Sequence, residues 1–337
     1  MSLPPLPRQT ERLQLTQPHG SADALLLANY AQQVKPLVVF TANAMDAARL
    51  KDELSFFLTG KTVLQLPDWE TLPYDHFSPH SDLISERLAT LWQVRQNAVD
   101  VLIVPLQTAM GVLPPVEFLT ATTFFIKKGD PFDAEQLRAD MAFAGYNHVT
   151  QVYGPGEFSI RGGLIDLFPM GSTLPFRIDL FDNEIETIRT FDVDTQRSLY
   201  PVPEIRLLPA REFPTDEEGR KKFRQNFRTA FEGDPSKARL YKDISNGVIP
   251  AGIEYYLPLF FDATATVFDY LPTEAVLVLH GELLKAAGQY WQDIAERHKL
   301  SYGEKDRPLL PPRELFVEPD LLFASIKKYR RIEIKPS

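Results

Sequence analysis

LVVFTANAMDAARLKDELSFFLTGKTVLQL (residues 37–66) contains a strand, a helix and a second strand in succession. Its two ends, LVVFT (37–41) and TVLQL (62–66), are short apolar runs of strand type. Between them, apolar residues recur at roughly helical spacing, at Met45, Ala48, Leu50, Leu54 and Phe57. Because strands separated by helices favour a parallel sheet covered on both faces, this stretch predicts an α/β fold.

The following residues continue the same pattern. Asp82 is a plausible N-cap for a helix whose apolar face carries Ile84, Leu88, Leu91 and Trp92. Another apolar run, VDVLIVP (99–105), then predicts a third strand. The first third of the chain is therefore expected to build one parallel sheet.

Around Thr120 the pattern changes to one helix-like stretch (132–144) followed by closely spaced strands. These strands are FSIRGGLIDLF (158–168), PFRIDLF (175–181) and EIETIRTFDV (184–193). Asp182 and Asn183 suit a tight turn, so the last two runs predict a hairpin. We expect this region to form a separate, mostly antiparallel α+β unit.

After Pro209 the chain is predicted to become helical again. Thr215 and Glu218 have capping-box spacing, and Phe223, Phe227 and Phe231 line one face of the helix that follows. A strand (275–281), a helix (282–298) and a proline-rich connector (307–315) come next.

Composition excludes several classes of protein. The chain has 337 residues, no cysteine and a net charge of -9, and its 44% hydrophobic content is typical of soluble domains. Without cysteine there is no disulfide and no thiolate nucleophile or metal ligand. The negative charge argues against a protein whose main task is to coat nucleic acid. No run approaches the roughly 18 apolar residues of a membrane span, so we expect a cytoplasmic protein without membrane contact.

Two short motifs suggest chemistry, but their context argues against it. TGKT (59–62) ends like a phosphate-binding loop, yet Ser55 stands where that loop needs glycine, a helix leads in and a strand leads out. Asp75, His76, His80 and Asp82 could be interpreted as a metal site, but Pro79 prevents the helix that would align the two imidazoles. We therefore expect no metal and no cofactor, although a third ligand converging on this loop would make a metal-dependent hydrolase.

The strand PFRIDLF places an aromatic side chain on its polar face. Alternation puts Phe176, Ile178 and Leu180 on one face and Arg177, Asp179 and Phe181 on the other. An exposed Phe beside an Arg is typical of binding hot spots, whereas a second packed layer would bury it. The residues alone leave both interpretations open.

RGGLIDLFPMGS (161–172) followed by PFRIDLFDNEIETIRTFDVDTQRS (175–198) resembles a signature shared by UvrB and the Mfd family of bacterial transcription-repair coupling factors. Three further stretches resemble Mfd rather than UvrB: DWETLPYDHFSPHSDLISERLATL (68–91), LLPAREFPTD (207–216) and PAGIEYYLPLFF (250–261). The resemblance covers nearly the whole chain. It implies the amino-terminal, UvrB-like portion of such a factor.

This resemblance also shows where the chain departs from UvrB. HGSADALLLANYA (19–31) falls at the UvrB phosphate loop, with Gly20 and Ser21 in the loop. Asp23 and Ala24 then occupy the positions of the loop Lys and the Mg²⁺-binding hydroxyl, which implies a degenerate loop that repels a triphosphate. Only residues 77–81 stand where UvrB carries its DNA-clamping hairpin, so damage verification by this chain is not expected.

The implied architecture is a degenerate RecA-like α/β domain with a parallel sheet (residues 1–121 and 210–337), interrupted by a UvrB-like UvrA-binding α+β domain (122–209). The implied function is recruitment of UvrA in transcription-coupled nucleotide excision repair, without nucleotide hydrolysis by this chain. RNA polymerase and DNA would be contacted by other parts of the family's full-length protein, an ATP-dependent DNA translocase. An active UvrB-like NTPase or helicase is the alternative.

Arg161, Arg177 and Phe181 match the family's UvrA-contact positions. The arginines would supply charge-assisted hydrogen bonds, and Phe181 a desolvated anchor. Because these side chains are expected on an exposed face, we expect Arg177→Ala and Phe181→Ala to weaken binding without a large loss of stability.

Overall fold

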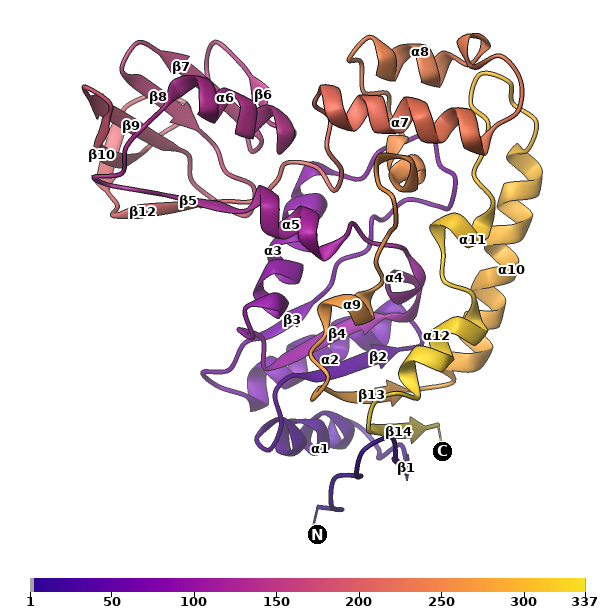
Figure 1. Ribbon diagram of the computed structural model, residues 1–337. Coiled ribbons are helices and arrows are strands. Elements are labelled where there is room, and N and C mark those ends of the chain that lie inside the picture. Colours follow the sequence, from indigo (N-terminus) through magenta and orange to yellow (C-terminus); the bar gives the residue numbers. More distant parts are fainter. Residues whose placement is uncertain (1–2, 337) are drawn as a thin grey trace.

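The computed structural model describes residues 3–336, which form an α/β body with a β-rich module and a helical unit beside it (Figure 1). The β-rich module lies at the upper left of Figure 1 and the helical unit at the upper right. The parallel sheet lies at the bottom, close to both ends of the chain.

A six-stranded parallel sheet forms the base of the body. Its strand order is β1-β14-β13-β2-β4-β3, and every neighbouring pair runs parallel. The strands are β1 (Arg12–Thr16), β2 (Leu37–Thr41), β3 (Val63–Gln65), β4 (Val101–Pro105), β13 (Val276–His280) and β14 (Arg331–Lys335).

Side chains of β2 are buried on both faces of this sheet. Leu37 and Val39 pack with α1 (Ala22–Ala31) and α2 (Ala44–Phe57). Val38 and Phe40 face the opposite cluster. That second layer contains α3 (Ser81–Arg95), α4 (Leu106–Met110), α9 (Val267–Tyr270), α10 (Leu283–Ser301) and α12 (Pro319–Ile326). Burial on both faces explains why these strands are continuously apolar.

The β-rich module contains a second six-stranded sheet of order β11-β10-β9-β8-β7-β6. The module also holds a two-stranded ladder of β5 and β12, the helix α6 and, leading into it, α5. The bounds are α5 (Val116–Thr122), β5 (Phe124–Lys127), α6 (Ala134–Phe143), β6 (Asn147–His148), β7 (Glu157–Arg161), β8 (Leu164–Leu167), β9 (Phe176–Phe181), β10 (Glu184–Phe191), β11 (Ser198–Pro201) and β12 (Glu204–Leu207). One face of the larger sheet joins the hydrophobic cluster of the body through Ile165 and Ile178.

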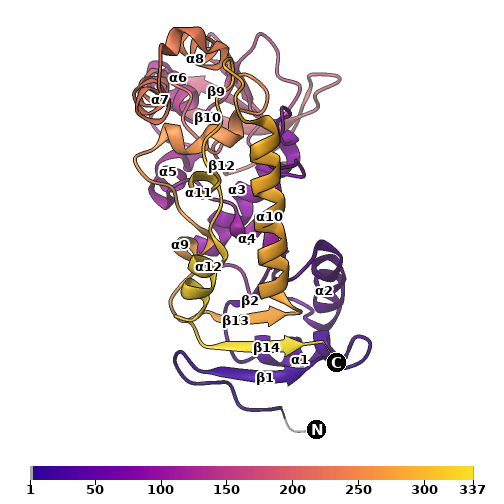
Figure 2. The same cartoon turned by 90° about the vertical axis from the view of Figure 1, so that its right-hand side faces the viewer.

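The helical unit has its own aromatic core. Phe223 and Phe227 of α7 (Glu217–Ala230) pack with Phe260 of η2 (Ile253–Phe260). The unit also includes η1 (Pro235–Lys237), α8 (Arg239–Ser245) and α11 (Pro312–Leu315). The lower ends of α10 and α12 then return the chain to the parallel sheet, as the side view in Figure 2 shows.

The structure confirms the α/β class and the parallel sheet, and it is consistent with the degenerate RecA-like fold. The Asp182–Asn183 turn also joins β9 to β10 as predicted, with a positive φ of 53° at Asp182. The domain limits stay a prediction, and Met1, Ser2 and Ser337 lie outside the described residues.

Two predicted helix caps are wrong by one or two residues. The N-cap of α3 is His80 rather than Asp82, because the His80 ring nitrogen accepts a hydrogen bond from the Asp82 amide. The N-cap of α7 is Asp216 rather than Thr215, because its carboxylate accepts from the Gly219 amide at 2.9 Å.

Across residues 3–336, we find no helix with the length and hydrophobicity needed to cross a bilayer.

Candidate functional site

The candidate binding surface is built on neighbouring strands of the larger module sheet. Arg161 ends β7, whereas Arg177 and Phe181 lie on β9. Asp166 of β8 pairs with Arg177 in the ladder, and Leu164 pairs both with Arg161 and with Asp179. The sheet register therefore brings the two predicted arginines to one side of the sheet.

Asp166 is the centre of this arrangement. Its carboxylate is buried and accepts two hydrogen bonds from Arg177, from Nε at 2.8 Å and from Nη2 at 3.0 Å. Arg161 Nη2 donates to the same carboxylate at 3.0 Å. Two parallel N–H···O bonds fix the plane of a guanidinium, so Asp166 sets the orientation of Arg177.

Arg177 is held further by the loop after β10. Its Nη1 donates to the Gln196 carbonyl at 2.8 Å, and its guanidinium carbon lies 4.6 Å from the centre of the Phe191 ring. The hydrogen bond to Asp166 raises the pKa of Arg177, which therefore stays charged. Only 12% of its side chain is exposed. The expectation of an exposed Arg177 that can be truncated without loss of stability is therefore wrong.

Phe181 and Arg161 are the accessible members of the surface. Phe181 is 67% exposed at the end of β9, as alternation predicts, and 51% of the Arg161 side chain is exposed. Phe181 also lines a shallow hollow with the acidic residues Asp182, Glu184 and Glu186. The hairpin carries these groups to the outer edge of the module (Figure 1).

The degenerate phosphate loop has a different local structure. The strand–loop–helix order of a phosphate loop is kept, from β1 through Gly20 and Ser21 into α1. Ser21 donates from its hydroxyl to Glu53 rather than capping the helix. Ala24 is buried beside Asp23, which lies in the first turn of α1.

The carboxylate of Asp23 is fully buried and paired. Arg49 of α2 donates to both of its oxygens, at 2.7 and 3.0 Å, and His280 at the end of β13 donates from Nε2 at 2.8 Å. Burial alone raises the pKa of Asp23, but the hydrogen bonds from His280 and Arg49, with the Arg49 charge, leave it well below its ordinary value. An internal carboxylate thus takes up the positive charge that gathers around the start of α1.

The other two sequence motifs lie where their context predicts. TGKT falls between α2 and β3, so a helix precedes it and a strand follows. Asp75 accepts from the amides of Leu72 and His76, and His80 caps α3. Among residues 3–336, no group of three or more His, Cys, Asp or Glu side chains is placed to hold a metal ion.

The sequence interpretation missed three residues that organise these sites, namely Asp166, Arg49 and His280. Asp166 carried a usable signal, because a charged residue within the apolar run LIDLF requires a partner once it is buried. Arg49 and His280 carried none, because they lie 26 and 257 residues from Asp23 in the sequence.

Comparison with known proteins places these sites in a family. Residues 124–213 match the model described as the UvrB interaction domain. A transcription-repair-coupling factor of Escherichia coli (strain K12) is 44% identical over 318 residues, which cover 94% of this chain. Relatives of the same name in Haemophilus influenzae and Bacillus subtilis are 43% and 29% identical, over 93% and 86% of this chain.

In each of these three relatives the match covers 28% of the relative's length. The chain therefore corresponds to a part of these proteins, and the UvrB interaction domain model falls on the module that carries Arg161, Arg177 and Phe181. The chain belongs to the transcription-repair-coupling factor family, as its amino-terminal, UvrB-like region.

Proposed function

We propose that this chain recruits UvrA in transcription-coupled nucleotide excision repair and hydrolyses no nucleotide itself. The observation that carries the proposal is the exposed Phe181 beside an ordered arginine pair, in the segment that matches the UvrB interaction domain. The names of the relatives support the repair pathway, and the matched domain supports a UvrA-binding role.

The surface has the composition of a small protein–protein hot spot. Phe181 offers an aromatic side chain to be desolvated, and Arg161 offers an accessible guanidinium already ordered by Asp166. A pre-ordered side chain loses less conformational entropy on binding, so Asp166 would increase affinity without contacting the partner. Arg177 would contribute its remaining exposed edge and hold Asp166 in place.

The proposal includes a division of labour along the chain. Residues 122–209 would bind UvrA, while residues 1–121 and 210–337 would form the degenerate RecA-like scaffold. Contacts with RNA polymerase and DNA, and ATP-dependent movement along DNA, would belong to parts of the longer family proteins beyond the matched 28%.

Absence of nucleotide hydrolysis is proposed from the groups around Asp23. A phosphate loop needs unoccupied cationic groups at the start of the helix, but Arg49 and His280 are already bound to Asp23. A triphosphate would have to displace a buried carboxylate and would itself be repelled by that charge.

The test is capture of purified UvrA by the immobilised chain. We expect the wild type to bind and Phe181→Ala to bind at least about thirtyfold more weakly, because truncating an aromatic anchor typically removes about 2 kcal/mol or more. Phe56→Ala is the matched control, since Phe56 is 78% exposed on α2, in a different part of the fold. No capture of UvrA by the folded wild type would overturn the proposal.

A further inference from the structure

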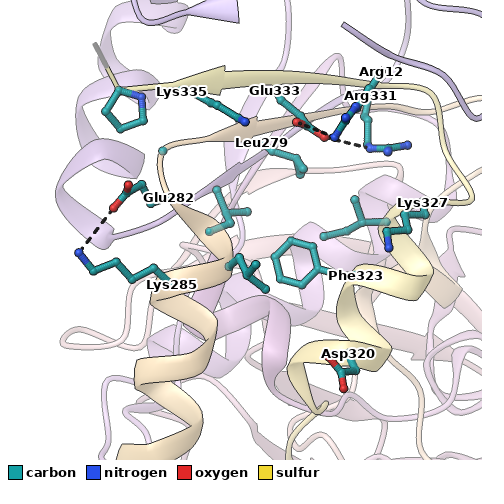
Figure 3. Close-up of a pocket in the computed structure, with 15 residues that line it drawn as sticks. Arg12, Leu279, Glu282, Lys285, Asp320, Phe323, Lys327, Arg331, Glu333 and Lys335 are labelled. Carbon is teal, nitrogen blue, oxygen red and sulfur yellow. Dashed lines mark hydrogen bonds and ion pairs between the residues drawn. The ribbon is translucent and has the colours of Figure 1, made fainter. Parts of the chain in front are cut away.

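A groove of about 880 Å³ lies between α10, α12 and the outer strands of the parallel sheet (Figure 3). We call it the α10–α12 groove. One wall is the start of α10, the opposite wall is α12, and the exposed faces of β14 and β1 close it along the third side. It lies in the body of the protein, away from the module that carries the proposed UvrA surface.

The sheet face along this groove is unusual for a parallel sheet. Ile332 and Ile334 of β14 are buried on the side of α1, whereas Arg331, Glu333 and Lys335 line the groove. Parallel strands are usually apolar on both faces because helices cover both. Polar alternation on β14 therefore marks a sheet face that no helix of the described chain covers.

The groove is basic although the chain as a whole is acidic. Five basic side chains line it, against three acidic ones, in a protein of net charge -9. Glu333 is neutralised locally, because it accepts from Gln14 at 3.0 Å and forms ion pairs with Arg12 and Arg331 (Figure 3). Within the described residues, Lys327 and Lys335 have no ion-pair partner within 4.0 Å.

The floor of the groove is apolar. Leu283 and Ile326 are buried there, and the ring of Phe323 projects from α12 towards α10 (Figure 3). Leu284 lines the same groove and is 67% exposed. An exposed Leu next to an aromatic floor and a basic rim calls for an occupant with both an apolar stripe and negative charge.

We propose that the α10–α12 groove binds an acidic amphipathic helix of a partner protein. Such a helix would place apolar side chains at positions i, i+3, i+4 and i+7 on Leu284 and Phe323, and its carboxylates near Lys327 and Lys335. Nucleic acid fits less well, because phosphates make no use of an aliphatic floor and two of the five cations are already paired with Glu333.

The test uses a short fluorescein-labelled helical peptide with Leu at the four apolar positions and Glu on the flanking faces. Fluorescence anisotropy measures its binding to the whole chain. We expect saturable binding that weakens at least about tenfold in the double variant Lys327→Glu/Lys335→Glu, because two attractive charges become repulsive. Lys51→Glu/Lys237→Glu is the matched control, since it makes the same charge change at two exposed sites outside the groove.

Three further measurements locate the site and separate the outcomes. Binding should protect the amides of α12 and β14 from hydrogen exchange, and Phe323→Ala should weaken it in protein that melts as a single folded species. A peptide with Lys in place of Glu should not bind the groove. The proposal is overturned if the acidic peptide does not bind, if both double variants bind it equally, or if only a short DNA duplex binds and depends on Lys327 and Lys335.

Discussion

Asp166 determines how the candidate surface presents its two arginines. A carboxylate buried in a strand is unfavourable unless it is paired, and Asp166 is paired by Arg177 on one side and Arg161 on the other. The same contacts make Arg177 structural and leave Arg161 accessible. Three residues of similar chemistry thus have different roles because their burial differs.

Arg177→Ala is expected to destabilise the module by about 3 kcal/mol, because it removes the two-bond partner of a buried carboxylate. Arg161→Ala should cost under about 1 kcal/mol, since half of that side chain is in water. Urea denaturation monitored by circular dichroism measures both. Arg189→Ala is the control, because Arg189 is an exposed arginine opposite Arg177 on β10. Equal stability of the Arg177 and Arg189 variants would show that Asp166 does not depend on Arg177.

Asp23 makes a second prediction, which concerns pH. Its pKa is lowered in the folded state, so its stabilising contribution is complete above the unfolded-state pKa of about 3.9 and is lost as the pH falls through the folded value. Asp23→Asn should therefore reduce the free energy of unfolding by about 3 kcal/mol at neutral pH. The difference from wild type should narrow below about pH 4.

Denaturation series at several pH values measure this difference. Asp52→Asn, at an exposed position on α2, should stay within about 0.5 kcal/mol of wild type throughout. A gap between wild type and Asp23→Asn that is the same at every pH would contradict the role given to the Asp23 charge.

The strand–loop–helix element from β1 to α1 keeps its shape while its chemistry is changed. We predict that isothermal titration with Mg-ATP gives no binding heat for the wild type. We also expect none for the variant Asp23→Lys/Ala24→Thr, because Arg49 and His280 would then face a new cation without a counter-charge. A micromolar dissociation constant for the wild type would revive the NTPase alternative.

The start of α7 distinguishes the predicted cap from the observed one. Asp216→Ala should cost about 1 kcal/mol, because the Gly219 amide loses its acceptor at the helix start. Thr215→Ala should cost only a few tenths of that, and thermal melting of the two variants measures the difference. The opposite order would restore Thr215 as the cap.

Most elements of the parallel sheet could be predicted because their burial is written into the sequence. LVVFT and VDVLIVP are apolar throughout since both faces of β2 and β4 are covered. β1 and β14 were missed because RLQLT and RIEIK are short and alternate with charge, which also suits a loop. Their strand character comes from pairing with each other across the length of the chain.

At the scale of the whole molecule, the body and the module carry separate surfaces. The parallel sheet closes its own phosphate-loop position with Asp23, and the module presents Phe181 and Arg161 at its outer edge. The α10–α12 groove lies on the body, so a partner there need not compete with one at the module. This arrangement suits a recruiting protein better than an enzyme, because the accessible groups lie on surfaces rather than in an enclosed catalytic pocket.

The measurement that tests the central claim most directly is a calorimetric titration of UvrA into the wild-type chain and into Phe181→Ala, with Phe56→Ala as the control. The account predicts that wild type and Phe56→Ala bind UvrA alike, while Phe181→Ala binds at least about thirtyfold more weakly and melts within a few degrees of wild type. Wild-type affinity in a folded Phe181→Ala protein would contradict it.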